Sequence, residues 1–201
     1  MINQNIYNEL EKRYGKVSSW TIWSQPIDNR PKSNMGSLDV FDDPDLLNKL
    51  NTRFVFVGLN GSGVHEGFYD PIKPWHNFHS DNPRGNDYKL RYALNATPFW
   101  GSYITDIIKD IEEVDSGKVV KCTKKHPEIM RKNIQTFKDE LRLLGGNPVI
   151  IALGNASFKL LKKHLAGDYN IYKIKHYAAY IGKENYRKEL LETLSHLDNI
   201  L

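Results

Sequence analysis

The sequence predicts an α/β protein with a central, mostly parallel sheet of four strands and helices on both faces. Four short apolar runs rich in β-branched residues predict the strands, at residues 53–59, 102–110, 148–154 and 170–176. Amphipathic patterns predict helices at residues 127–146, 155–166 and from 183 onward. Strands that alternate with helices favour parallel pairing, because parallel neighbours need a crossover connection between them.

The first 50 residues precede the first predicted strand and have a largely helical pattern. Residues 3–14 carry apolar side chains at helical spacing, and Gly15 follows as a helix stop. A turn-rich segment covers residues 24–37, and the acidic residues of 42–50 can cap a short helix. We therefore expect a single domain over residues 1–201, with an N-terminal helical extension of about 50 residues.

Composition excludes several classes of protein. The single cysteine, Cys122, rules out an internal disulfide and a four-cysteine zinc site. No apolar run approaches the roughly 20 residues needed to span a bilayer, and the N-terminus lacks the pattern of a signal peptide. We expect a cytoplasmic protein. The net charge of +4, with lysines clustered at 118–125, 159–164 and 173–189, suits a polyanionic partner, although such clusters are often only solvated faces.

Polar residues stand at the end of each predicted strand. These are Asn60, Asp106, the pair Gly154–Asn155, and His176. In open parallel sheets, ligands bind outside the carboxyl ends of the strands. We therefore expect these side chains to share one rim, together with the long loop of glycine, proline, histidine and aromatic residues that follows the first strand.

Several chemistries fit this rim poorly. The stretch "GLNGSGVHEG" lacks the Gly-Lys-Ser/Thr ending of a P-loop and the glycine spacing of a dinucleotide fingerprint. His76 and His79 could bind a metal, but no third ligand stands at compelling spacing. Ser62 could act as a nucleophile with His65 or His176, yet the chain has no Gly-x-Ser-x-Gly elbow. The remaining amide, carboxylate, imidazole and aromatic groups suit a flat heterocycle, and the basic exterior suits its phosphates.

Ordered motifs resemble those of the uracil-DNA glycosylase superfamily, closest in style to the mismatch-specific uracil/thymine group. "VFVGLNGSG" resembles the first motif, and "WHNFHSDNPRGNDYKLRYAL" is similar to the aromatic segment and the helix after it. "YITDIIK", "VIIALGNASFKLL" and "KHYAAY" resemble the later strand, strand–helix and histidine motifs, in the family's order from about residue 53 to 190. Gly61 and Tyr177 stand where the family usually has proline, and Asp106 replaces the asparagine that many relatives use to read uracil.

The resemblance implies a single uracil-DNA-glycosylase-like domain, three-layered α/β/α, with strand order 2-1-3-4. It implies an enzyme that hydrolyses the N-glycosidic bond of a deaminated or mismatched base in DNA. Asn60 would position the water, since an amide can hardly deprotonate it, while His176 would donate to the departing base and Phe78 would stack on it. Base contacts are further expected from Gly58, Leu59, Gly61, Asp106 and Asn155. Phosphate contacts are expected from Ser62, Arg84, Lys175, Tyr177, Lys183 and Arg187.

We expect no metal or other cofactor, no membrane association, DNA with a flipped base as the partner, and a monomer. A non-catalytic nucleic-acid or nucleotide-binding protein on the same fold remains the alternative. A change of Asn60 to aspartate is compatible with retained or raised turnover, because the fastest members of the resembled family carry aspartate at the matching position.

Overall fold

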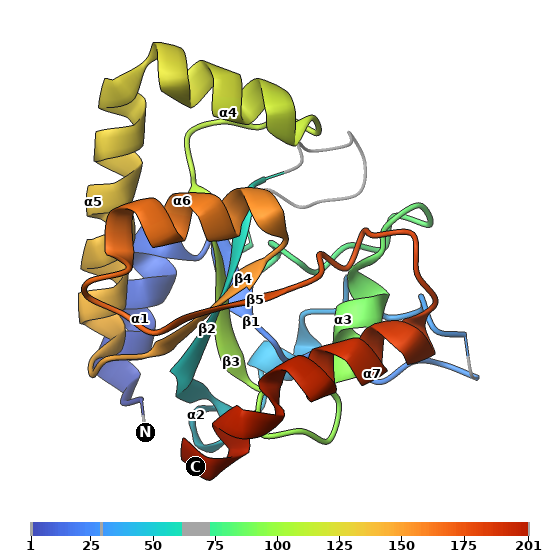
Figure 1. Ribbon diagram of the computed structural model, residues 1–201. Helices are drawn as coiled ribbons and strands as arrows, with labels where there is room; N and C mark the ends of the chain where they lie inside the picture. Colours follow the sequence, from blue (N-terminus) through green and yellow to red (C-terminus); the bar gives the residue numbers. More distant parts are fainter. Residues whose placement is uncertain (1, 29, 62–72, 201) are drawn as a thin grey trace.

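The computed structural model describes residues 2–28, 30–61 and 73–200. Its sheet has the strands β1 (Ser18–Trp20), β2 (Asn51–Asn60), β3 (Ser102–Ile108), β4 (Val149–Leu153) and β5 (Ile171–Ile174). Their order across the sheet is β1-β3-β2-β4-β5 (Figure 1). The four strands predicted from the sequence are β2 to β5. They pair in parallel, and they lie in the predicted relative order.

The predicted total of four strands is wrong, because β1 adds a fifth. This strand pairs antiparallel with β3, with Ser19 opposite Ile104. It is only three residues long, which is too short for an alternating pattern to show in the sequence. The sheet is therefore mixed, and the N-terminal segment (residues 2–50) contributes a strand as well as helices.

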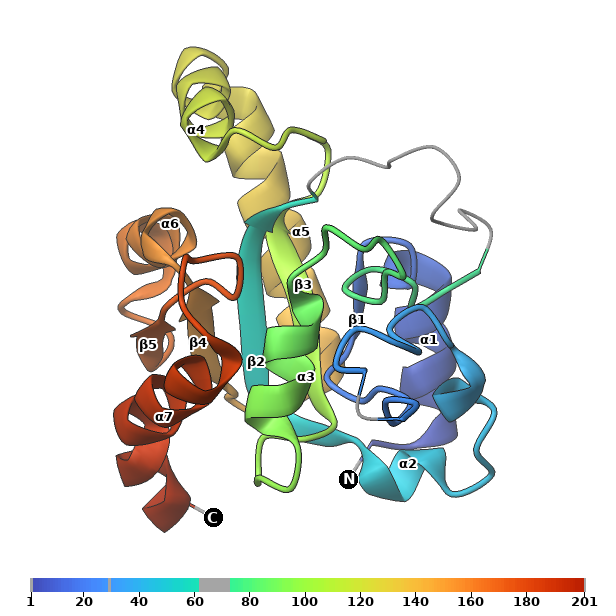
Figure 2. The same cartoon turned by 90° about the vertical axis from the view of Figure 1, so that its right-hand side faces the viewer.

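Seven α-helices surround the sheet in the described part of the chain. They are α1 (Gln4–Tyr14), α2 (Leu46–Lys49), α3 (Asp87–Leu94), α4 (Ser116–Lys125), α5 (Pro127–Leu144), α6 (Asn155–Leu165) and α7 (Lys183–Leu194). Short 3-10 helices cover Asp39–Phe41 and Ser195–Ile200. Helices α1, α5 and α6 lie against one face of the sheet, and α3 and α7 cover the other (Figures 1 and 2).

Alternation along β2 divides the core between these two faces. Val55 and Val57 point to the side of α1, α5 and α6, whereas Phe54 and Phe56 point to the side of α3 and α7. All four side chains are buried, as a central strand with two covered faces requires. The two cores fix the register of β2 and so fix where Asn60 leaves the sheet.

Local sequence signals explain where the helices begin. Asn3 and Asp115 accept hydrogen bonds from the first turns of α1 and α4, and Pro127 opens α5. Gly154 precedes α6 with φ +89°, a left-handed conformation that favours glycine. None of the helices in the described residues is both long and apolar enough to cross a lipid bilayer.

Candidate functional site

The carboxyl ends of the parallel strands open into a cavity of about 610 Å³. Each of the four strands β2 to β5 brings one of the predicted rim positions to it. Asp106 lies inside β3 near its carboxyl end, and the others stand at the end of their strand or just after it: Asn60, Gly154–Asn155 and His176. The cavity wall also includes the predicted residues Leu59, Gly61, Phe78, Arg84 and Tyr177. The sequence therefore placed most of the candidate residues in one cavity, because parallel strands carry their carboxyl ends to the same edge.

Asn60 is held in one orientation by three backbone carbonyls. Its side-chain Nδ2 donates hydrogen bonds to the carbonyl oxygens of Gly61 (2.7 Å), Glu113 (2.8 Å) and Ile111 (3.2 Å). An oxygen in that place would face three other acceptors, so these contacts identify the NH2 side of the amide. The opposite atom, Oδ1, accepts no hydrogen bond from any residue that the structure describes. Asn60 therefore offers a fixed acceptor to a molecule in the cavity.

His176 is a neutral imidazole with a defined tautomer. Its Nδ1 accepts a hydrogen bond from the backbone N–H of Ala178 at 3.1 Å, which places the ring proton on Nε2. Burial lowers the pKa of this imidazole to about 4, so the ring is uncharged near neutral pH. The left-handed Gly154 lets the chain pass close to it, since a Cβ at residue 154 would lie 3.3 Å from the His176 Cβ. His176 can donate one hydrogen bond without carrying a charge.

Asp106 is a buried carboxyl group that is partly protonated near neutral pH. Burial raises its pKa to about 7, although the side-chain amide of Asn77 donates to Oδ2 at 3.3 Å and Lys109 lies nearby. Gly58 is the neighbour that makes room for it, because Gly58 and Asp106 pair across β2 and β3. Gly58 does not line the cavity itself, but it positions a carboxyl group that does.

The segment of residues 75–80 presents Phe78 to the cavity in a strained backbone conformation. Trp75 and Phe78 have φ of +67° and +64°, values that cost energy for residues with a side chain. The N-terminal segment compensates this cost with hydrogen bonds. The Oγ of Ser19 donates to the Trp75 carbonyl at 2.8 Å, and the indole N–H of Trp23 donates to the Phe78 carbonyl at 3.1 Å. The N-terminal segment therefore holds the cavity wall in place.

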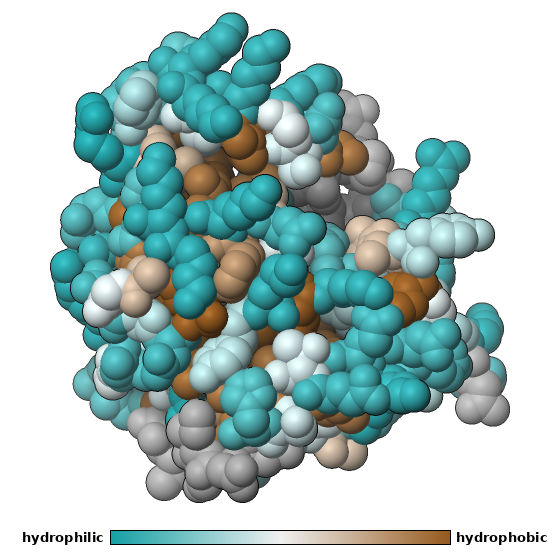
Figure 3. Space-filling model, in the orientation of Figure 1, coloured by the Kyte–Doolittle hydropathy of each residue, from teal (hydrophilic) through white to brown (hydrophobic). Residues whose placement is uncertain are grey.

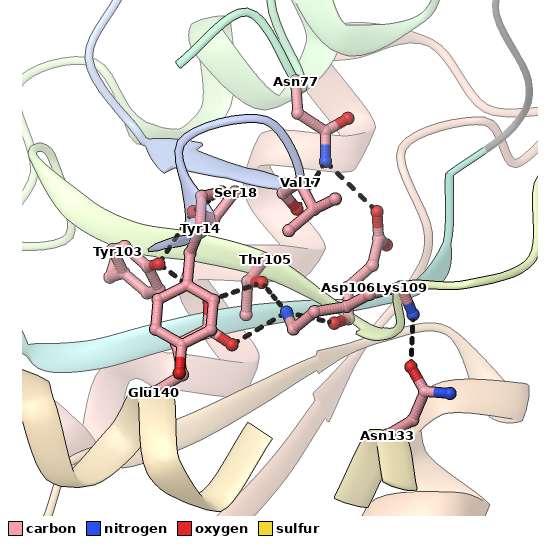
Figure 4. Close-up of polar contacts among 10 residues, drawn as sticks. All are labelled: Tyr14, Val17, Ser18, Asn77, Tyr103, Thr105, Asp106, Lys109, Asn133 and Glu140. Atoms are coloured by element: carbon pink, nitrogen blue, oxygen red, sulfur yellow. Dashed lines mark hydrogen bonds and ion pairs between the residues drawn. The ribbon is translucent and has the colours of Figure 1, made fainter. Parts of the chain in front are cut away.

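A buried polar network lies on the other side of β3 from Asn77 (Figure 4). Lys109 forms an ion pair with Glu140 on α5 at 2.7 Å, and its Nζ also donates to Thr105 Oγ1 and to the Asp106 carbonyl. Glu140 accepts further hydrogen bonds from Tyr103 and Thr105. Because these contacts pair the two buried charges with each other, they fix the end of β3, where Asp106 points toward the cavity.

Sequence reasoning missed Asp87, Asn77 and Tyr180. Asp87 opens α3 and lines the cavity, and the pKa of its carboxyl is raised to about 7 by burial and by the charge of Asp106. Asn77 connects Asp106 to the Val17 carbonyl. Tyr180 is fully exposed, in the segment that follows His176. The motif containing Asn77 and Asp87 was visible in the sequence, but no spacing rule relates these residues to Asp106.

Three of the predicted phosphate contacts lie outside the cavity wall and already have partners. Lys175 pairs with Glu189 at 2.7 Å, and Lys183 pairs with Glu184 at 2.6 Å. Arg187 donates to the carbonyls of Tyr92, Ala93 and Asn95, which cap the end of α3. Arg84 is exposed and lines the cavity, and it has no ion pair among the described residues. Ser62, another predicted phosphate contact, lies outside the described residues.

The histidine pair considered as metal ligands is used otherwise. His79 is buried, both its ring nitrogens contact backbone carbonyls, and burial lowers the pKa of its imidazole to about 4. Nδ1 of His76 contacts the Lys73 carbonyl at 2.7 Å. Within residues 2–28, 30–61 and 73–200, no group of three or more histidine, cysteine, aspartate or glutamate side chains is arranged to hold a metal ion.

The cavity thus combines a fixed acceptor, a neutral donor, a buried carboxyl group and an aromatic ring. No protein-family model matches the chain, and no curated protein is detectably similar to it.

Proposed function

We propose that the protein is a DNA glycosylase that hydrolyses the N-glycosidic bond of a deaminated or mismatched base. The observation that carries this proposal is the pairing of Asn60 and His176 in one cavity. The acceptor Oδ1 of Asn60 and the donor Nε2–H of His176 are not engaged by any residue that the structure describes. Hydrolysis of an N-glycosidic bond needs both functions, one toward the water and one toward the departing base. The ordered motif resemblance supports the same reaction.

In the proposed reaction the target base leaves the stack and enters the cavity. Asn60 Oδ1 accepts a hydrogen bond from the attacking water and orients it toward C1′ of the sugar. The bond between C1′ and the base nitrogen breaks, and its electron pair stays with the base. Nε2–H of His176 donates to the base as this negative charge develops, and the base later takes a proton from solvent. The water loses its proton to solvent as the new C–O bond forms.

Phe78 and Asp106 would recognise the base itself. A buried ring beside the cavity suits stacking on a planar heterocycle. The carboxyl of Asp106, with a pKa of about 7, can donate a hydrogen bond when protonated and accept one when ionised. A protonated carboxyl matches the alternating acceptor and N–H donor of a uracil-like edge.

The loop after His176 is the proposed contact to the DNA duplex. Buried Lys89 on α3 donates from its Nζ to the carbonyl of Ala179 at 3.0 Å, which anchors this loop beside the cavity. Tyr180 then projects fully into solvent. We assign Tyr180 to the space that a flipped base leaves behind, where an aromatic ring can stack on the neighbouring bases.

The test is base release from labelled oligonucleotides that carry uracil, thymine opposite guanine, hypoxanthine or xanthine. Alkali-labile abasic sites should appear with at least one of these substrates. Asn60→Ala and His176→Ala should each lower the rate by about 10² to 10³, the usual cost of one transition-state contact. Asn48→Ala, an amide on α2 outside the cavity wall, is the matched control. DNA binding without release of any base would replace this proposal by the alternative of a non-catalytic nucleic-acid-binding protein.

A further inference from the structure

A second cavity, of about 630 Å³, lies between α4, α5 and α6. Its apolar wall includes Val120 of α4, Met130 of α5, and Ala156 and Leu160 of α6. Figure 1 shows α4 lying across the end of α5 and above α6, and residues from these three helices line the cavity. Figure 3, in the same orientation, shows hydrophobic surface between the hydrophilic side chains of α4 and α6. We call it the helical groove.

The rim of the helical groove is basic. Lys124, Arg131, Lys159 and Lys163 line it from the three helices, and all four are exposed. None of them forms an ion pair with a residue that the structure describes. Among the residues that the structure describes, the lining contains no aspartate or glutamate. Four uncompensated positive charges around an apolar floor define the chemistry of a complementary ligand, which must be apolar on one side and acidic on its flanks.

We propose that the helical groove binds an acidic amphipathic helix of a partner protein. Such a helix places an apolar ridge in the groove through side chains at i, i+3, i+4 and i+7, and its flanking carboxylates reach the basic rim. The groove itself is built with the same periodicity, since Ala156, Lys159, Leu160 and Lys163 share one face of α6. The proposal does not depend on the glycosylase activity, although Ala156 lines both cavities.

Nucleic acid fits the helical groove less well. Phosphates would satisfy the basic rim, but they gain nothing from an apolar floor. Among the described residues, the lining has no phenylalanine, tyrosine or tryptophan on which a base could stack, and its one ring is the imidazole of His164. A single-carboxylate amphiphile would satisfy the floor and leave most of the four cations unpaired. An acidic helix is the ligand that uses both the floor and the whole rim.

The test uses the full chain labelled with bimane at Cys122, its single cysteine, which lies on α4 and is partly exposed. The probe is a designed helical peptide of about 16 residues with a leucine stripe flanked by glutamates. Two control peptides have the same composition in shuffled order, or lysine in place of glutamate. A duplex of about 20 base pairs tests the nucleic-acid alternative. Binding is followed by bimane fluorescence, and separately by the anisotropy of labelled peptide.

The acidic peptide should bind, and the two control peptides should bind at least about tenfold more weakly. Lys159→Glu with Lys163→Glu should weaken the acidic peptide by a further factor of about ten or more. Lys12→Glu with Lys16→Glu changes the net charge equally on exposed sites outside the groove lining, and it should leave the affinity within about twofold. Equal binding of acidic and shuffled peptides, or an unchanged affinity in the groove variant, would overturn the proposal. Duplex binding that the groove variant abolishes, without peptide binding, would reassign the groove to nucleic acid.

Discussion

Gly58 and Asp106 face each other across β2 and β3, and a Cβ at residue 58 would lie 2.2 Å from the Asp106 Oδ1. Gly58→Ala should therefore push the carboxyl group out of its place. We expect a loss of about 1–3 kcal/mol in the free energy of unfolding, as for other overpacked cores. A displacement of this kind should also lower the proposed base release by about 10²-fold. Denaturant unfolding and single-turnover kinetics measure the two effects.

Gly167→Ala is the matched control for this substitution. A Cβ at residue 167 meets no atom within 4 Å, and Gly167 lies outside the cavity wall. It should change neither stability nor base release by a comparable amount. If Gly58→Ala behaves like Gly167→Ala, the contact with Asp106 does not constrain the site.

Asn60→Asp should impair the protein, contrary to the expectation from the sequence. The new carboxylate oxygen would replace Nδ2 and face the carbonyl oxygens of Gly61, Ile111 and Glu113. This arrangement raises the pKa of the introduced carboxyl, so the folded state favours its protonated form. The variant should lose stability as the pH rises through that raised pKa, and base release at neutral pH should fall by about 10²-fold or more.

Thermal or denaturant unfolding of this variant between pH 4 and pH 8 provides the check. Turnover equal to or above that of the parent protein at pH 7 would show that the three carbonyls do not control the choice of amide at this position. The same outcome would favour a carboxylate acting as a base.

Asp106 should make the stability depend on pH. Its pKa in the folded protein is about 7, well above the ordinary value of 3.8. The folded state therefore binds this proton more tightly than the unfolded state, so the contribution to stability is complete below pH 3.8 and is lost as the pH rises to 7. The loss amounts to as much as about 4 kcal/mol. Asp106→Asn should flatten this part of the curve, and parallel curves for the two proteins would contradict the assignment.

Arg84 and Arg187 should separate DNA binding from stability. Arg84→Ala should leave the free energy of unfolding nearly unchanged, and it should reduce the log–log salt slope of DNA affinity by about 0.9 if the guanidinium contacts a phosphate. Arg187→Ala removes hydrogen bonds to three carbonyls, so it should cost about 1–2 kcal/mol of stability. It should leave the salt slope unchanged. Fluorescence titrations at several salt concentrations and denaturant unfolding test both expectations.

The Lys109–Glu140 pair should be far more important for stability than the exposed ion pairs. Glu140→Ala leaves the Lys109 ammonium buried without its partner, which should cost about 3–5 kcal/mol. Asp168→Ala breaks the half-exposed pair with Lys138 and should cost less than about 1 kcal/mol. Urea unfolding of both variants measures this difference, and equal costs would show that the buried network contributes little.

The sequence by itself determined the parallel strands and the shared rim. Four apolar runs alternating with helices leave few arrangements other than a parallel sheet. Such a sheet brings Asn60, Asp106 and His176 to one edge whatever the details of the connecting loops. These residues could therefore be predicted from the sequence, because the rule that ligands bind at the carboxyl ends of parallel strands depends on topology alone.

Contacts between distant parts of the chain were decided only by the tertiary structure. Strand β1 has no detectable pattern of its own and exists because β3 offers it an edge. The orientation of the Asn60 amide depends on carbonyls about 50 residues away in the chain, and the proximity of Asp87 to Asp106 depends on how α3 packs. Residue type alone does not distinguish Lys175 and Arg187 from basic side chains without a partner. Only the packed structure shows that Lys175 pairs with Glu189 and that Arg187 donates to carbonyls at the end of α3.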